Sequence, residues 1–305
     1  MTQPALHVHG RRPIHRNPLR LASVLIGGGC SAALILLPFY AVFRFALRDG
    51  WTAYLGYLVE PSTLHSIKLS LTTVAITVPV CTAFGICAAW AIAKFDFPGR
   101  KLLISLIELP LSISPIVIGA AYLFVFGREG LLGPWLLTYD LRLVFNATAI
   151  VLVTIMVTLP YIFREVLPLM QIQGNDEEQV AITLGAGPLT TFWRVTLPNI
   201  KWALLYGITL CLARGLGEYG SVAVVSGAIR NRTNTMPLQI DLLFNDFVQT
   251  GAFAVASILT SVAVVTLLVK IGVEAASRRQ QKTAAHFTGV PSPRDRDLLL
   301  PGEGI

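Results

Sequence analysis

The chain has 305 residues, of which 54% are hydrophobic and only 13% are charged. Soluble proteins carry about 25% charged residues, so the composition argues against a soluble domain and favours a chain embedded in lipid, where charge is costly. The formal net charge of +7 could indicate a nucleic-acid partner, but the basic residues stand at the ends of apolar segments, which argues against nucleic-acid binding and for a role in membrane topology.

Apolar segments recur along the whole chain, and about 20 mostly apolar residues suffice for a helix to cross the bilayer core. Segments of that length or nearly so predict about six transmembrane helices, at residues 21–43, 69–93, 102–126, 147–163, 202–226 and 251–269. Backbone groups in lipid must be satisfied internally, so these segments are helices. The first is too long for a cleaved signal peptide. We therefore predict an all-α, polytopic membrane domain at 21–271, after a basic N-terminal arm at 1–20 and before a disordered cytoplasmic tail at 272–305.

Lys and Arg residues set the orientation of such a domain, because cytoplasmic loops carry more of them. With six helices, both termini share one side with the second and fourth connections. That side holds sixteen of the basic residues and the opposite side holds seven. The distribution predicts that both termini lie in the cytoplasm.

The third apolar segment contains Pro110 and Pro115, which remove intrahelical hydrogen bonds and should bend or break the helix. Broken helices at membrane depth often line cavities. Two hydroxyls, on Ser112 and Ser114, lie between the prolines. They either bind an oxyanion or cap the freed backbone.

The connection at 164–201 is the longest one predicted on the cytoplasmic side. Asn175 and Asp176 are good N-cap residues, and Glu177 and Glu178 suit the positive end of a first helical turn. The sequence therefore predicts a short helix that begins near Asp176.

The predicted short helix ends near Leu184 and has one small apolar face. That face consists of Val180, Ala181 and Leu184. Gly185 and Gly187 can end the helix in a left-handed turn, and Pro188 suits the first turn of a second helix. A helix this short is not stable alone, so we expect it to pack on a partner.

Three ionisable residues fall well inside apolar segments: Glu108, Arg214 and Glu218. An unpaired Arg at mid-helix costs at least ~2.5 kcal/mol, and Arg214 and Glu218 are four residues apart, the spacing of a helical ion pair. The pair either lines an anion path, with Arg214 attracting the anion, or packs the fifth helix against its neighbours or a sister subunit. Glu108 is a further candidate for the path.

The loop at 164–201 resembles the cytoplasmic loop of ABC-importer permeases. That loop has the pattern E-A-A, three residues, G, nine residues, I, one residue, L-P. Gly185, Val195, Leu197 and Pro198 stand at the expected positions. The first triplet departs, because Gln179, Val180 and Ala181 replace E-A-A and the acidic residues lie one or two places earlier.

Other segments are similar to the sulfate/thiosulfate permeases of this family. They lie at 89–95, 191–205, 225–227, 233–238 and 252–257. The resemblance implies a type I (MetI-like) permease fold with a cytoplasmic coupling helix. It also implies a sister permease in a heterodimer, two ABC ATPase subunits and an extracytoplasmic sulfate- or thiosulfate-binding protein. Molybdate and tungstate permeases share the loop and the fold, so they remain an alternative.

Several catalytic patterns are missing from the sequence. No G-x-x-x-x-G-K-[ST] loop is present, so the resemblance places ATP and Mg²⁺ on the partner ATPase and no cofactor on this chain. The cysteines form no C-x-x-C pair and have no His at metal-ligand spacing. We therefore predict a transport subunit without enzymatic activity or a metal site. The rival class, an ATP-independent secondary transporter, should show inverted repeats or charge relays, and only one candidate ion pair appears.

Overall fold

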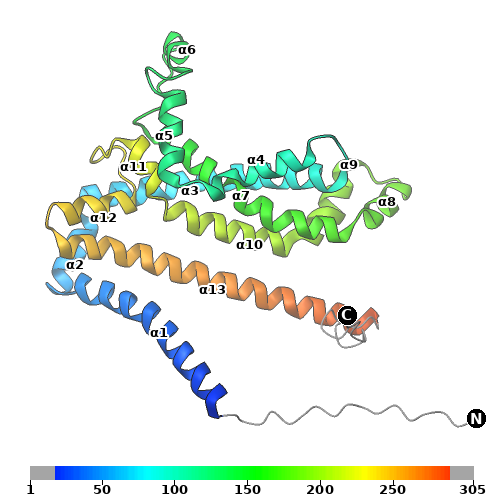
Figure 1. Cartoon of the computed structure of the whole chain (residues 1–305), viewed down its shortest axis with the longest axis horizontal. Helices are drawn as coiled ribbons and strands as arrows, with labels where there is room; N and C mark the ends of the chain where they lie inside the picture. The colour runs from blue at the N-terminus through cyan, green and yellow to red at the C-terminus, as the bar shows by residue number, and fades with distance from the viewer. Residues whose placement is uncertain (1–17, 289–305) are drawn as a thin grey trace, which may run out of the picture.

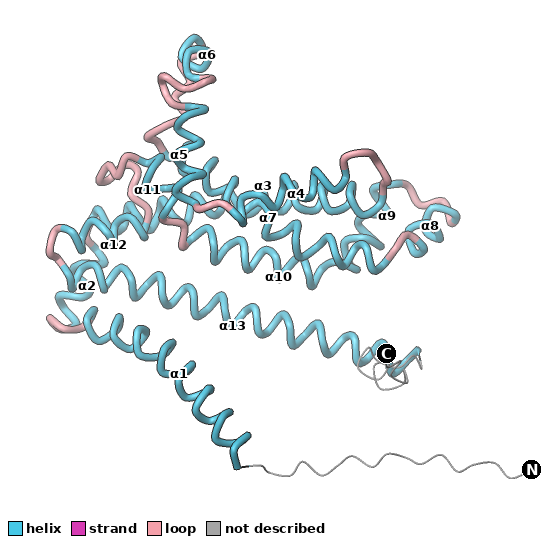
Figure 2. Tube along the Cα trace, in the orientation of Figure 1, coloured by secondary structure: helices cyan, strands magenta, loops and turns pink. Residues whose placement is uncertain are grey.

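The computed structural model describes residues 18–288 of the chain. Within these residues the secondary structure is helical and no strand is found. Figure 2 shows helices joined by short loops. The prediction of an all-α fold is confirmed. The predicted N-terminal arm, up to residue 17, lies outside the described residues.

Five helical segments are long and apolar enough to cross a membrane, and a bent helix pair forms a sixth candidate. The five segments contain α1 (Pro18–Ala46), α3 (Pro61–Lys94), α7 (Ala147–Gln173), α10 (Leu197–Leu216) and α13 (Gln249–Thr288). The bent pair is α4 (Arg100–Ser112) and α5 (Pro115–Phe126), whose axes differ by 111°. These segments account for all six predicted spans.

The break between α4 and α5 lies where the prolines predicted it. The residue before a proline is pushed out of the α region, and Ser114 accordingly has ψ 134°. Ile113 is also extended, with ψ 141°. Pro115 then opens α5 at a position where its missing N–H costs nothing. Pro110 remains inside α4, so the second proline alone ends the helix.

The fifth predicted span, 202–226, is not continuous, which corrects the sequence prediction. The helix α10 ends at Leu216, and α11 (Gly220–Ser226) begins after a three-residue break. Glycines stand on both sides of this break and within it. A glycine inside a helix lowers its stability by about 1 kcal/mol relative to alanine. The carboxylate of Glu218 then accepts the backbone N–H of Ser221, so a side chain replaces a helical hydrogen bond.

Other helices differ from the predictions at their ends. The helix α3 begins at Pro61 and not at residue 69, and α7 continues to Gln173. At the C-terminus, α13 continues as a helix to Thr288, past residue 272 where a disordered tail was predicted to begin. Ala and Gln between these positions favour a helix. The remainder of the predicted tail, 289–305, lies outside the described residues.

The core of the bundle is formed by α3, α7 and α10. Ile162 of α7 is fully buried between glycines of its two neighbours. A Cβ on Gly85 of α3 would lie 2.9 Å from the Cγ2 of Ile162, and one on Gly207 of α10 would lie 3.0 Å from its Cα. Small residues let helix backbones approach closely in membranes. These contacts fix the spacing of the three central helices.

Short helices lie at the two ends of this core (Figure 1). At one end lie α8 (Asp176–Thr183) and α9 (Pro188–Thr191). At the other end lie four short helices, with α5 and α6 projecting out of the bundle (Figure 1). These four are α2 (Trp51–Val59), α6 (Gly133–Thr138), α11 and α12 (Met236–Asn245). The helix α1 diverges from α13 toward its N-terminal end.

Replacing Gly85 by Leu should destabilise the bundle, because the new side chain would collide with Ile162 and the backbone of α7. We expect a loss of about 1–3 kcal/mol, as for other overpacked cores, measured by thermal unfolding of the detergent-purified chain. Gly272→Leu is the matched control, because a Cβ there meets nothing within 4 Å. Equal losses in both variants would contradict the packing described here.

Candidate functional site

The structure places the predicted coupling helix where the sequence indicated. The helix α8 runs from Asp176 to Thr183, and Gly185 after it has φ +86°, the left-handed turn expected of a helix end. Gly187 does not share that role, because its φ is −71°. Pro188 opens α9 as predicted. Asn175 occupies the N-cap position, but its side chain makes no capping hydrogen bond.

The coupling segment, defined here as residues 175–196, presents large apolar side chains to its surroundings. Leu184 and Leu189 keep 83% and 76% of their surfaces exposed. The other exposed apolar residues of the segment are Val180, Ile182 and Trp193. Several large exposed apolar side chains in one short segment are typical of a protein–protein contact. Of the predicted face, Val180 and Leu184 are exposed and Ala181 is half-buried.

The remaining residues of the loop pattern lie in α8, in the turn that precedes α10 and at the start of α10. A π-helical turn, η1 (Phe192–Thr196), leads directly into α10, which begins with Leu197 and Pro198. Val195 of that turn lines a cleft of about 410 Å³ with Val180 of α8. Gln179, which stands where the pattern has Glu, is exposed. The pattern therefore positions α8 against the start of α10.

Acidic residues in the first turn of α8 hold it to the bundle. Glu178 accepts a hydrogen bond from Thr196 Oγ1 at 2.6 Å and pairs with Lys94 Nζ at 3.1 Å. Glu177 accepts a hydrogen bond from the side-chain amide of Asn199. The sequence predicted both carboxylates at the helix N-terminus, with Glu178 in the coupling loop, but gave no indication that Lys94 pairs with Glu178. In the sequence, Lys94 is a basic residue at the end of a predicted span, and that position does not indicate which acidic residue it pairs with.

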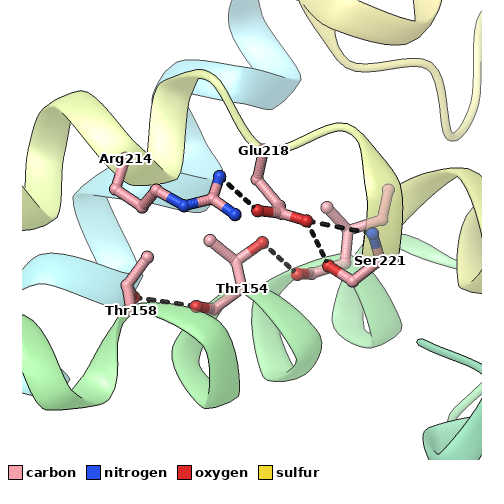
Figure 3. Close-up of polar contacts among 6 residues, drawn as sticks. Thr154, Thr158, Arg214, Glu218 and Ser221 are labelled. Atoms are coloured by element: carbon pink, nitrogen blue, oxygen red, sulfur yellow. Dashed lines mark hydrogen bonds and ion pairs between the residues drawn. The ribbon is translucent and has the colours of Figure 1, made fainter. Parts of the chain in front are cut away.

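The predicted Arg214–Glu218 pair is present at the broken end of α10 (Figure 3). The Arg214 Nη1 and Glu218 Oε2 atoms are 2.5 Å apart. The Glu218 side chain is 1% exposed, whereas that of Arg214 is 28% exposed. The second oxygen of Glu218 accepts hydrogen bonds from the N–H and the hydroxyl of Ser221, at 2.9 and 2.7 Å. One buried carboxylate therefore joins α10 to α11.

Two threonines of α7 lie beside this pair (Figure 3). Their hydroxyls donate to carbonyls of their own helix, Thr154 to Ile150 at 2.6 Å and Thr158 to Thr154 at 2.8 Å. A Cβ on Gly215 would lie 3.7 Å from the Thr154 methyl group. The threonines thus pack closely beside the ion pair and carry no charge. The charges of Arg214 and Glu218 are therefore balanced by each other.

The broken ends of the two interrupted spans are in contact. A Cβ on Gly220 of α11 would lie 3.2 Å from Pro115 and Ile116 of α5. On the other side, a Cβ on Gly119 would lie 2.8 Å from the carbonyl oxygen of Ser221. We call this contact between α5 and the Glu218–Ser221 turn the double break. Its glycines are required for the close approach of the two segments.

The other path candidates do not join this arrangement. Glu108 is half-buried on α4, and Ser112 and Ser114 are exposed. Within the described residues, no hydrogen bond or ion pair links these side chains to Arg214 or Glu218. Ser114 stands at the N-cap of α5, but its side chain makes no capping hydrogen bond. The Ser114 hydroxyl therefore does not cap the backbone freed by the helix break, which was one of its two predicted roles.

Sequence reasoning missed a buried stripe of hydroxyls on α3. Its members recur every three or four residues and are at most 3% exposed: Thr63, Ser66, Ser70, Thr73 and Thr77. Ser70 Oγ accepts the backbone N–H of Met236 at 2.8 Å, which anchors the start of α12. The helical spacing of these residues was a usable signal.

A family model and several known proteins are similar to this chain in sequence. Residues 82–282 match the family model described as "Binding-protein-dependent transport system inner membrane component". The sulfate transport system permease protein CysW of Escherichia coli K12 is 45% identical over 262 residues, which cover 85% of this chain and 90% of that protein. CysW of Synechocystis sp. is 41% identical over 237 residues, covering 78% and 86% of the two chains.

Solved structures share the fold at low sequence identity. One is a bacterial ABC transporter involved in the import of the acidic polysaccharide alginate, with a TM-score of 0.67 and 18% identity. The match covers 87% of this chain and 96% of that chain. A second alginate transporter structure, in complex with a periplasmic protein, gives a TM-score of 0.68 at 17% identity, covering 86% and 94% of the two chains.

The Arg214–Glu218 pair should contribute measurably to stability. Removing one partner leaves a buried charge uncompensated, which costs about 3–5 kcal/mol in buried pairs. We expect Arg214→Gln and Glu218→Gln each to lower the free energy of unfolding, with a double-mutant coupling of about 0.5–3 kcal/mol. Thermal or denaturant unfolding in detergent would measure it.

Asp140→Asn provides the control for these variants. Its carboxylate lies 3.9 Å from Arg142, and both side chains are largely exposed, so the loss should stay below about 1 kcal/mol. Additive effects of the Arg214 and Glu218 substitutions would show that the two side chains do not stabilise the bundle as a pair.

Proposed function

The chain belongs to the family of binding-protein-dependent inner-membrane transport components, and we propose that it is the permease subunit of an ATP-driven importer for sulfate and thiosulfate. One observation carries the proposal: the similarity to a sulfate permease extends over 90% of that protein and is not limited to the coupling segment. A helical bundle with six candidate spans agrees with this function.

The exposed apolar surface of the coupling segment supports an ATPase partner. Leu184, Leu189 and Trp193 are each largely exposed, and large apolar side chains exposed in one short segment indicate a partner that covers them. We propose that this surface docks on one of two ABC ATPase subunits, which bind ATP and Mg²⁺, while this chain binds no cofactor. A sister permease would complete a heterodimer around the path of the anion.

The distribution of charge supports an orientation for the subunit. The end that carries α8 faces the cytoplasm in this proposal, and the end that carries α6, α11 and α12 faces outward (Figure 1). Both termini then lie in the cytoplasm of a bacterial cell, as the excess of Lys and Arg on that side favours. A binding protein for sulfate or thiosulfate would deliver its anion at the outward end.

Arg214 is the residue that we propose meets the anion. Its guanidinium is partly exposed, whereas Glu218 is buried beneath it. Arg is always charged and offers several donors in a fixed plane, which suits an oxyanion. Glu218 holds the arginine in place and keeps its charge partly balanced, so that the anion can leave. The double break allows this part of α10 and α5 to rearrange together when ATP drives the cycle.

The proposal is tested by uptake of radiolabelled sulfate in a strain that lacks its own sulfate permease. The chain is supplied with its sister permease, ATPase and binding protein. We expect ATP-dependent uptake that excess thiosulfate blocks and molybdate hardly affects. Uptake of molybdate without sulfate would keep the importer and change the anion. Uptake without an ATPase would instead place the chain among secondary transporters.

The docking surface has its own test. Leu184→Ser with Leu189→Ser should reduce the amount of ATPase subunit that co-purifies with the detergent-solubilised chain by at least about tenfold, because hot-spot side chains contribute 2 kcal/mol or more each. Ile172→Ser is the control, since Ile172 is equally exposed at the end of α7 but outside the coupling segment. Full retention of the ATPase by the double variant would remove this surface from the interface.

A further inference from the structure

An ion pair connects the coupling helix to the central bundle. Lys94 is the last residue of α3, and its Nζ lies 3.1 Å from Glu178 Oε2 of α8. The same ammonium donates to the carbonyl oxygen of Gly174, at the end of α7, at 2.5 Å. The other oxygen of Glu178 accepts from Thr196, whose π-turn leads into α10. Four elements therefore meet at one pair of charges, which we call the coupling joint.

The coupling joint is shielded from water. The side chains of Lys94 and Glu178 are 9% and 17% exposed. Glu178 also borders a cavity of about 440 Å³ whose other walls are mostly apolar, with Trp90 of α3 and Phe192 of the π-turn among them. Charge-assisted hydrogen bonds strengthen in such surroundings. The joint is therefore stiffer than an ordinary surface ion pair.

We propose that Lys94 and Glu178 are positioning residues that transmit movement of the coupling helix to α3, α7 and α10. This inference rests on the proposed function, because the movement comes from the ATPase. When α8 shifts, the ammonium and carboxylate carry the shift to the ends of the helices that form the core. Neither residue touches the anion or ATP.

The same geometry explains the displaced acidic triplet of the loop pattern. Both carboxylate oxygens of Glu178 already have partners within this chain. Gln179, where the pattern has Glu, is neutral and exposed. The acidic residue nearest to the pattern position therefore faces the bundle, and α8 offers apolar side chains and an amide to the ATPase.

A merely structural role predicts a different outcome from a transmitting one. If the joint only keeps α8 folded, loss of Lys94 or Glu178 would lower ATP hydrolysis and uptake in parallel, because fewer complexes would assemble. If it transmits movement, assembled complexes would hydrolyse ATP and move fewer anions for each ATP. The number of anions imported per ATP hydrolysed separates the two.

The experiment uses the whole transporter, with its sister permease, ATPase and binding protein, reconstituted in liposomes. Sulfate uptake and ATP hydrolysis stimulated by the binding protein are measured on the same samples. We expect Lys94→Gln and Glu178→Gln to lower the sulfate-to-ATP ratio by about tenfold, within the range of known coupling effects. Lys94→Arg should retain most of the ratio, because a guanidinium can still donate to Glu178 and to the Gly174 carbonyl.

The matched control is Arg100→Gln. Arg100 pairs with Asp96 at 2.9 Å near the joint, but both residues lie in one short segment and the Asp96 side chain is 99% exposed. The sulfate-to-ATP ratio of the Arg100→Gln transporter should equal that of the wild type. If one of Lys94→Gln and Glu178→Gln fails to assemble, the ratio of the other, compared with that of Lys94→Arg, decides the question.

Two results would overturn the inference. One is an unchanged sulfate-to-ATP ratio in all assembled Lys94 and Glu178 variants. The other is a sulfate-to-ATP ratio in Lys94→Arg as low as that in Lys94→Gln, which would show that a cation beside Glu178 and the Gly174 carbonyl is not what coupling requires. Failure of the wild-type complex to import sulfate would instead contradict the proposed function. The joint would then be tested with the anion that the wild type does import.

Discussion

The hydrocarbon core of a bilayer supplies no hydrogen-bond partner, so every interruption of a spanning helix must be repaired by the protein itself. This chain interrupts two spans, at Ile113–Ser114 and at Gly217–Tyr219. The second interruption is repaired by one carboxylate, because Glu218 accepts from Ser221 while Arg214 balances its charge. Burial of that carboxylate is tolerable only with all these partners, since an unpaired charge in this place would cost several kcal/mol.

The two interruptions depend on each other. Glycines at 119 and 220 bring α5 and the Glu218 turn to within van der Waals distance, so neither segment can move far alone. In contrast, α3 and α7 are long helices whose close contact is set by Gly85. The bundle thus combines a closely packed centre, formed by α3 and α7, with one region, the Glu218 turn, where a side chain already replaces a backbone hydrogen bond. Such a region can change conformation without breaking a regular helix.

Sequence patterns predicted the features that have a local cause. Pro115 pushes the residue before it out of the helical conformation, and the four-residue spacing of Arg214 and Glu218 indicated their pairing, which holds although Glu218 lies just past the end of α10. The break after Leu216 has no such signal, because glycines at 215 and 217 permit both a helix and a turn. The choice comes from Ser221 and from the contact with α5. The start of α3 was missed for a related reason: its first turns carry buried hydroxyls, which an apolar-segment criterion counts as polar.

The coupling joint could not be predicted, because Lys94 and Glu178 are distant in the sequence and belong to segments with separate local explanations. Lys94 suits the end of a span, and Glu178 suits the start of a helix. Both explanations are correct and neither requires the other residue. Only the fold, which brings the first turn of α8 to the last residue of α3, turns two terminal charges into one shielded pair. The pair also lies where α7 ends and where the turn into α10 lies, which is why we infer that a displacement of α8 acts on all three central helices. In this chain the attachment of α8 is made by the Lys94–Glu178 pair, by the hydroxyl of Thr196 and by the hydrogen bond between Asn199 and Glu177.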